Sequence, residues 1–400
     1  MTIISADSKP MFRFLAVMTA ASMVGLQGYS ILFNNYAVEV IGLNGNGVGV
    51  IQSVREIPGF LSLLAVFVML VIKEHRLAAI SIALLGIGTA ITGLFPTFGG
   101  LTFTTLVMSF GFHYYETTNQ SLTLQYFSSG VSPIVFGRLR SLAAASSIAS
   151  GCLIWLLSLF LDYRGTFLIV GTLVCLAGIW GLLQKPTHER VPPQLQRMIL
   201  KRKYLLYYIL TFLSGARRQI FMVFSVFLLV KVFHFSVREM TLLFIINNAV
   251  AWVLNPLIGR AIVRFGERRI CSSEYIGIIM IFMVYSFTDS RLLASAMYII
   301  DSILFNFSVA IRTYFQKIGA AEDIASSMAV GFTINHIAAV FLPALGGYLW
   351  MINYRIPFIA GAGLGLLSLI AAQFIHTHHE PEETAEEVLP PYSATEAEQV

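Results

Sequence analysis

The chain has 400 residues, of which 56% are hydrophobic and only 12% are charged. Soluble domains are about 45–50% apolar and about 25% charged, so this composition predicts an all-α membrane protein rather than a soluble enzyme. The formal net charge of +5 comes from basic residues in short loops. Because these residues form no patch, we expect no nucleic-acid partner.

Neither the cysteines nor any motif indicates catalysis. Cys152, Cys175 and Cys271 lie in apolar segments without the spacing of metal ligands, which favours buried thiols. The sequence contains no nucleotide-binding glycine loop, no nucleophile elbow and no histidine pair at helical metal spacing. We therefore expect no enzymatic activity, no cofactor and no bound metal. Any transport would draw its energy from an ion gradient or from the solute's own gradient.

Apolar runs bounded by charged or turn residues predict about twelve membrane-spanning helices, since about 20 residues cross a bilayer. The predicted spans are 12–36, 47–71, 77–95, 100–124, 141–161, 165–184, 204–230, 240–258, 271–288, 292–314, 325–349 and 356–375. They form two six-helix halves, residues 1–184 and 204–375. The fourth and tenth spans are the least apolar.

A linker over residues 185–203 joins the halves, and a tail over residues 376–400 ends the chain. The linker carries prolines and charges, and its PQLQRMILKRK stretch resembles a basic amphipathic helix that would lie on anionic membrane lipid. The tail is acidic and contains proline, which predicts disorder. Its histidines are read as solvated rather than as a metal site.

The distribution of lysine and arginine predicts the orientation. With the N-terminus in the cytoplasm, 17 of these residues fall on the inside face and only five on the outside face. This bias places both termini inside, and we expect a bacterial inner-membrane protein that works as a monomer.

One loop carries a recognisable pattern. Residues 255–270 read NPLIGRAIVRFGERRI, with two glycines, a basic run between them and paired arginines after them. This resembles the loop signature of the major facilitator superfamily between the second and third helices of a half, with Val263 where the family usually has an aspartate. The matching residues are Gly259, Arg260, Arg264, Gly266, Arg268 and Arg269. The resemblance implies a conformational latch here, and a central cavity lined by the first, fourth, seventh and tenth helices.

The seventh span, Tyr204 to Val230, carries Arg217, Arg218 and Gln219 near its middle. An arginine at this depth costs about 2.5–3.5 kcal/mol, so it must face water, a partner charge or a ligand. One reading is a structural pair held by carboxylates elsewhere. The other places a guanidinium in a polar cavity, and Arg218 is favoured because it shares a helix stripe with Ser214 and Ser225.

Polar residues at helical spacing mark the other cavity helices. For single amides, hydrogen bonding between helices is the alternative to solute binding. The carboxylates Glu116 and Asp301 are the preferred carriers of a coupling proton, because an unpaired charge in lipid is costlier. The candidates on the first span are Gln27 and Asn34, on the fourth His113, Tyr115, Glu116 and Gln120, and on the tenth Asp301 and Arg312.

Three further spans contribute candidates. Arg55 and Glu56 in the second span form either an internal ion pair or a site where Glu56 exchanges a proton. The eighth span presents Asn248 and Trp252 on one face. In the eleventh span, Asn335 is a candidate for solute binding, whereas His336 is read as a hydrogen-bonded interior residue.

Together these features predict a secondary transporter that moves a small solute, with an anion favoured because the span charges are on balance positive. We expect Arg217 and Arg218 to contact the solute, a proton or another ion to be coupled, and Arg55 and Arg312 to form gating ion pairs. Two alternatives remain open: proton-driven efflux of several drugs, and a membrane sensor or scaffold that transports nothing.

Overall fold

The computed structural model describes residues 7–43, 45–187, 200–235 and 237–377, and within them it contains helices but no strands. Within these described ranges, ten segments are long and apolar enough to cross a membrane. This confirms the predicted all-α membrane fold, while the count of twelve spans stays a prediction. Most of the amphipathic helix predicted in the linker, residues 193–199, lies outside the described residues, and so does the tail from residue 378, for which disorder was predicted.

The first part of the chain, which we call the N-terminal group, supplies the helices numbered α1 to α7. The N-terminal group comprises α1 (Lys9–Asn35), α2 (Gly45–Phe60), α3 (Ala65–Val68), α4 (Glu74–Ile91), α5 (Phe98–Tyr126), α6 (Ser132–Ser158) and α7 (Tyr163–Leu183). A π-helical turn, Tyr36–Val40, continues α1, and 3-10 turns at Leu61–Leu64 and Thr92–Leu94 follow α2 and α4.

The rest of the chain, the C-terminal group, repeats this pattern of long helices. It comprises α8 (Leu205–Gln219), α9 (Val226–Lys231), α10 (Val237–Phe265), α11 (Glu267–Phe287), α12 (Arg291–Phe305), α13 (Val309–Ile318), α14 (Ile324–Ile352) and α15 (Arg355–Gln373). A 3-10 turn at Arg202–Tyr204 precedes α8, and the turns between the helices are π-helical at Ile220–Ser225 and 3-10 at Asn306–Ser308 and Ala321–Asp323.

Local sequence signals explain several helix ends. Thr97, Asp162 and Ser290 cap α5, α7 and α12, each accepting a hydrogen bond from the backbone N–H three residues on. Helix α6 begins at Ser132, with Pro133 in its first turn, nine residues before the predicted start of that span. The earlier start places Arg138 and Arg140 within the helix rather than in a loop.

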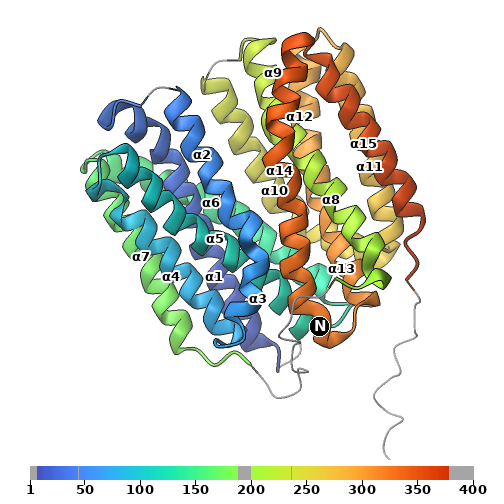
Figure 1. Cartoon of the computed structure of the whole chain (residues 1–400), viewed down its shortest axis with the longest axis horizontal. Helices are drawn as coiled ribbons and strands as arrows, with labels where there is room; N and C mark the ends of the chain where they lie inside the picture. The colour runs from blue at the N-terminus through green and yellow to red at the C-terminus, as the bar shows by residue number, and fades with distance from the viewer. Residues whose placement is uncertain (1–6, 44, 188–199, 236, 378–400) are drawn as a thin grey trace, which may run out of the picture.

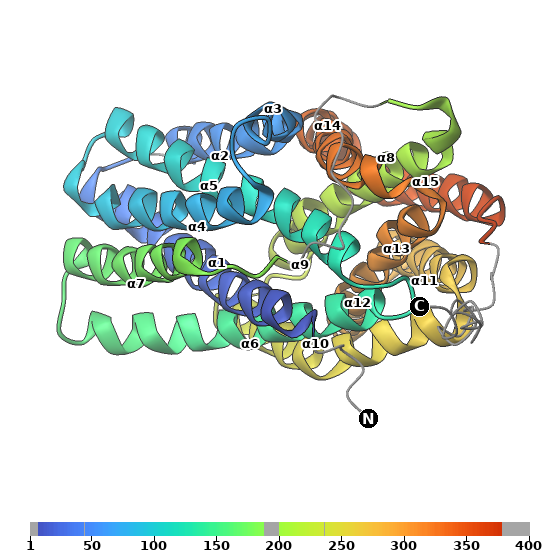
Figure 2. The ribbon, with the colours of Figure 1, turned by 90° about the horizontal axis from the view of Figure 1, so that it is seen from below.

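The two groups lie side by side in Figure 1 and are closer together where α7 ends and α8 begins, which we call the linker end. Figure 2 shows α3 beside α14, and α6 along α10. One buried apolar cluster lies entirely within the N-terminal group. A second lies mostly in the C-terminal group and includes Leu124 and Phe136 from the other side. The groups therefore share a packed contact at this end.

Hydrogen bonds reinforce this contact. The Gln316 side chain donates to the carbonyl oxygens of Leu124 and Phe127, at 2.6 and 2.7 Å. The Thr333 hydroxyl donates to the carbonyl of Phe60 at 3.0 Å and accepts from the backbone N–H of Leu63 at 2.9 Å. Each of these bonds joins the two groups, so the structure represents a state that is closed at the linker end.

Candidate functional site

A cavity of about 500 Å³ lies between the two groups. Its walls come from α1, α5 and α6 on one side and from α8, α10, α12, α13 and α14 on the other. A volume of this size is within the range of small-molecule sites in proteins, about 300–1,000 Å³. A site built from both groups changes shape whenever the groups move relative to each other.

Arg218 and Arg217 have different environments, as expected for adjacent residues that point about 100° apart on a helix. Arg218 lines the cavity, and none of the described carboxylates lies within 4 Å of its guanidinium. Arg217 is buried inside the C-terminal group, where its Nη2 atom lies 2.5 Å from Oε1 of Glu274 in α11. In this conformation Arg217 is a structural ion pair, and it does not line the cavity.

The cavity carries an excess of positive charge. Arg140, Arg218 and Arg312 line it together with one carboxylate, Glu116, which leaves a net charge of +2 when the histidines are neutral. Arg312 and Arg140 are the charged groups that act most strongly on Glu116. Arg140 also donates a hydrogen bond to Oδ1 of Asn306 across the two groups, at 2.9 Å. A low-dielectric site of this charge attracts anions.

Several buried polar atoms around Arg218 have no hydrogen-bond partner among the described residues. Buried polar groups are nearly always paired, so these atoms are available to a solute or to water. Those that line the cavity are Nδ1 of His113, Oδ1 of Asn119, Nε2 of Gln120, Oγ1 of Thr211, Nε of Arg218, Oδ1 of Asn247 and Oδ1 of Asn255. The set offers both donors and acceptors.

Eight candidates from the sequence come together in this cavity. They are Gln27, His113, Glu116, Gln120, Arg218, Asn248, Arg312 and Asn335. Sequence reasoning missed Arg140 and Asn247 of the cavity, and it missed Glu274, the partner of Arg217. The signal for Glu274 was present, because an acid inside an apolar run needs a partner charge.

Other candidates lie elsewhere. The Tyr115 hydroxyl is buried in the N-terminal group, 2.8 Å from Oγ1 of Thr19. Trp252 is 54% exposed and is not part of the cavity lining. Asp301 is buried near Arg217 and Glu274, away from the lining. The side chain of Asn34 falls outside the described part of the structure.

Arg55 and Glu56 form the internal ion pair that the sequence allowed, with Nη2 of Arg55 3.1 Å from Oε1 of Glu56. Both side chains are 28% exposed. The ion pair involves only Oε1 of Glu56, so Oε2 can contact another partner.

Each glycine of the loop signature has a physical role in the structure. A Cβ atom on Gly259 would lie 2.3 Å from the carbonyl oxygen of Pro133, so glycine permits the close approach of α10 to α6. Gly266 has φ of +80° and caps α11, a conformation that favours glycine. The arginines Arg260, Arg264, Arg268 and Arg269 are exposed, and Arg268 donates to Oε1 of Gln373 at 3.1 Å.

An acid within this loop was not identified from the sequence. Glu267 is 1% exposed, and its Oε1 atom lies 2.9 Å from Nζ of Lys317 in α13. This pair ties the start of α11 to the end of α13, at the linker end. Glu267 thus supplies a carboxylate to a loop in which Val263 stands where the family usually has an aspartate.

A family model described as the Major Facilitator Superfamily matches residues 15–341. No curated protein matches the chain. The structure is similar to that of the human organic anion transporter MFSD10 (TETRAN), with 10% identity, a TM-score of 0.74 and coverage of 92% of this chain and 100% of that one.

Two further solved structures show the same likeness. One is the E. coli fucose:proton symporter FucP, with 10% identity, a TM-score of 0.73 and coverage of 93% of this chain and 100% of that one. The other is a bacterial homologue of the iron transporter ferroportin in an outward-facing state, with 9% identity, a TM-score of 0.74 and coverage of 90% and 98%. At these identities the likeness shows the fold alone.

Proposed function

Because this chain belongs to the major facilitator superfamily, an integral-membrane family of transporters, we propose that it carries a small organic anion across the membrane by alternating access. The observation that supports this most is Arg218, a guanidinium in the cavity between the two groups without a carboxylate partner among the described residues. A guanidinium binds carboxylate or phosphate through two parallel hydrogen bonds. The anionic group of the solute would take the place of the missing partner.

The surroundings of Arg218 support a more specific solute class. The cavity's net charge of +2 favours anions over lipophilic cations, which disfavours the multidrug-efflux alternative. The unpaired amide oxygens of Asn119, Asn247 and Asn255 offer acceptors to hydroxyl or amine groups elsewhere on the solute. We therefore propose a solute with one anionic group and additional hydroxyl or amine groups. One structural relative is itself named an organic anion transporter.

Glu116 is the proposed carrier of a coupling proton. Protonation of Glu116 would raise the net charge of the cavity from +2 to +3, so the anion and the proton would each favour binding of the other. Mutually favourable binding of this kind corresponds to symport. Asp301 is the less favoured carrier, because it lies behind the cavity wall near Arg217.

The proposed orientation follows from the lysine and arginine bias of the sequence, which places the linker and both termini in the cytoplasm. Closure at the linker end then makes this the outward-facing state. The transport cycle would break the hydrogen bonds of Gln316 and Thr333 and form new contacts between the groups at the opposite end.

A thermal-shift screen of the purified protein against a panel of organic anions and lipophilic cations tests this proposal. A bound ligand at 100 times its dissociation constant stabilises a protein by about 2.7 kcal/mol. We expect particular anions to raise the melting temperature of the wild type but not of R218Q, while R202Q, at an exposed arginine outside the cavity, responds as the wild type does. Stabilisation by cations alone would contradict the proposal.

A further inference from the structure

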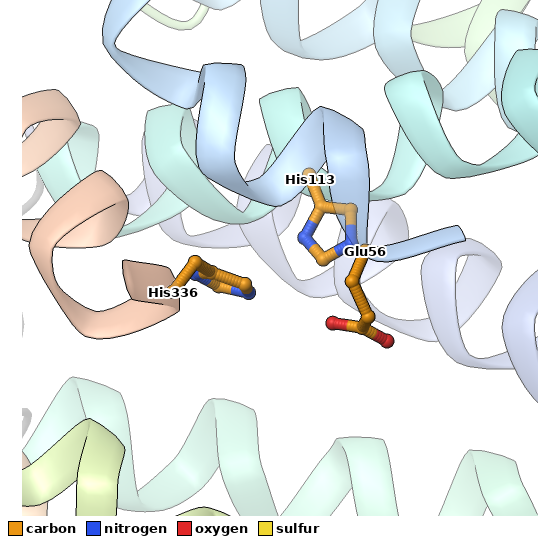
Figure 3. Close-up of side chains that lie close together, drawn as sticks. All are labelled: Glu56, His113 and His336. Atoms are coloured by element: carbon orange, nitrogen blue, oxygen red, sulfur yellow. The ribbon is translucent and has the colours of Figure 1, made fainter. Parts of the chain in front are cut away.

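Three side chains from three different helices converge beside the cavity. Glu56 comes from α2, His113 from α5 and His336 from α14, as Figure 3 shows. One ligand atom from each lies within 4.8 Å of the other two. The two imidazole rings meet edge to face, with centroids 5.0 Å apart and planes at 89°.

Both histidines have a ring nitrogen available to a ligand. His113 is 5% exposed, and its Nδ1 atom has no hydrogen-bond partner among the described residues. His336 is 1% exposed, and its Nδ1 atom lies 2.8 Å from the carbonyl oxygen of Phe332. A carbonyl accepts only, so Nδ1 of His336 carries the proton and Nε2 carries a free lone pair. Metal-bound histidines are commonly oriented by a hydrogen bond of this kind.

Gly59 makes room for this cluster. A Cβ atom at this position would lie 2.5 Å from Cδ2 and 2.8 Å from Nε2 of His336, and 3.0 Å from Cε1 of His113. Phe332 stacks on His336 with ring centroids 4.5 Å apart, which helps to hold the imidazole in place. The two rings therefore fit only because residue 59 has no side chain.

We propose that Glu56, His113 and His336 bind one divalent first-row transition-metal ion such as Zn²⁺. Two imidazoles and one carboxylate suit these ions, whereas Mg²⁺ and Ca²⁺ prefer oxygen ligands. Ligand atoms about 2.1 Å from a tetrahedral metal lie about 3.4 Å apart. The three ligand atoms now lie within 4.8 Å of one another, so each pair needs to approach by at most about 1.4 Å. Both histidines line the cavity, which provides a path for entry and leaves a coordination position open to it.

The charges near the site set its affinity. Arg55 pairs with Glu56, and Arg218 is the cation that acts most strongly on both histidines. These two positive charges oppose a cation, while the carboxylate of Glu56 offsets one of them. Coordination to imidazole nitrogen must therefore supply the binding, and it does so for Zn²⁺ but not for Mg²⁺.

Metal binding at this site would join the two groups. Glu56 and His113 belong to the N-terminal group and His336 to the C-terminal group, close to the bond between Thr333 and Phe60. A bound ion would hold the groups together and favour the state closed at the linker end. The inference goes beyond the proposed function, because it requires metal binding whether or not an anion is carried.

Calorimetric titration of the full-length protein with Zn²⁺ tests the site. The affinity tag should contain no histidine, and all variants should carry H376A, H378A and H379A, so that any Zn²⁺ bound is bound outside the tail. We expect one Zn²⁺ per chain and no response to Mg²⁺. Each of E56Q, H113Q and H336Q should weaken binding at least about tenfold. H75Q, at a buried histidine of α4 outside the cluster, should leave the affinity unchanged.

A second variant keeps the test decisive if a histidine substitution prevents folding. G59A retains every ligand but displaces both imidazoles, so it too should weaken Zn²⁺ binding at least about tenfold. Loss of binding in H113Q and in H336Q would show that the ion joins the two groups. The proposal is overturned if Zn²⁺ does not bind, or if H336Q and G59A bind it as tightly as the parent chain.

Discussion

The guanidinium of Arg217 lies 2.5 Å from the carboxylate of Glu274, and the two side chains are only 3% and 0% exposed. The neighbouring residue, Arg218, faces the cavity. One position of this arginine pair therefore stabilises the C-terminal group, and the next is available to a solute. The two positions should respond differently to substitution.

Breaking the buried pair should destabilise the protein. Removing one partner leaves an uncompensated charge, which costs about 3–5 kcal/mol, so E274Q should lower the melting temperature strongly. The exposed pair of Arg291 and Glu239 is a matched control, since its side chains are 48% and 43% exposed. E239Q should cost at most about 1 kcal/mol. Equal melting temperatures for E274Q and E239Q would contradict the structural role of the buried pair.

The contact between α6 and α10 depends on Gly259. In G259A the new Cβ atom would overlap the backbone oxygen of Pro133, which cannot move as a flexible side chain does. Overpacking of this kind costs about 1–3 kcal/mol, and thermal unfolding in detergent measures it. The control is G363A, where a Cβ atom meets nothing within 4 Å. We expect a lower melting temperature for G259A and no loss for G363A, and the reverse order would be inconsistent with the close approach.

Asp323 lies at the linker end, outside the membrane-spanning segments, and it should make stability depend on pH. Burial by itself would raise the pKa of Asp323, but hydrogen bonds from Lys201 at 2.5 Å and Tyr204 at 2.6 Å outweigh burial and hold the pKa below its usual 3.8. A lowered folded-state pKa stabilises the fold above pH 3.8, and this stabilisation is lost as the pH falls through the folded value.

Stability measurements on D323N test this dependence. The difference in unfolding free energy between wild type and D323N should be constant between about pH 5 and pH 8 and should shrink only in strong acid. If this difference in unfolding free energy changed across neutral pH, the pH dependence could not come from the carboxyl group of Asp323.

Much of the fold follows from local sequence signals. The apolar runs predict the membrane helices. The stripe of Ser214, Arg218 and Ser225 favours Arg218 over Arg217 for the cavity; Ser214 and Arg218 line the cavity, whereas Ser225 is fully buried outside its lining. The two glycines of the loop signature are expected to belong to a conformational latch, and in the structure Gly259 lies at the contact of α10 with α6 while Gly266 adopts a positive φ. These features depend on residues that are close in the sequence.

The features that sequence reasoning missed depend on tertiary packing or on a helix boundary. The predicted span 141–161 leaves out Arg140, whereas the helix in the structure begins at Ser132 and includes it. The partner of Arg217 lies 57 positions away, on another helix. His113 and His336 are separated by more than 200 residues, and no periodicity within one helix brings their rings together.

Substitution of Glu116 should separate binding from proton coupling. In proteoliposomes, E116Q should still exchange the anion in counterflow, because the arginines that hold it remain. It should no longer accumulate the anion when a pH gradient is imposed, since glutamine does not release a proton. Accumulation by E116Q at the wild-type level would rule out Glu116 as the proton carrier.

The most direct measurement is uptake by proteoliposomes of an anion found in the thermal-shift screen, compared between wild type, R218Q and R202Q. Loss of a hydrogen bond to a charged group costs about 1.5–3 kcal/mol. This corresponds to about 10- to 150-fold weaker binding. We predict that R218Q loses uptake at low anion concentration and keeps its melting temperature, while R202Q transports normally. Uptake by R218Q at the wild-type rate would contradict the claim that Arg218 binds the anionic group of the solute.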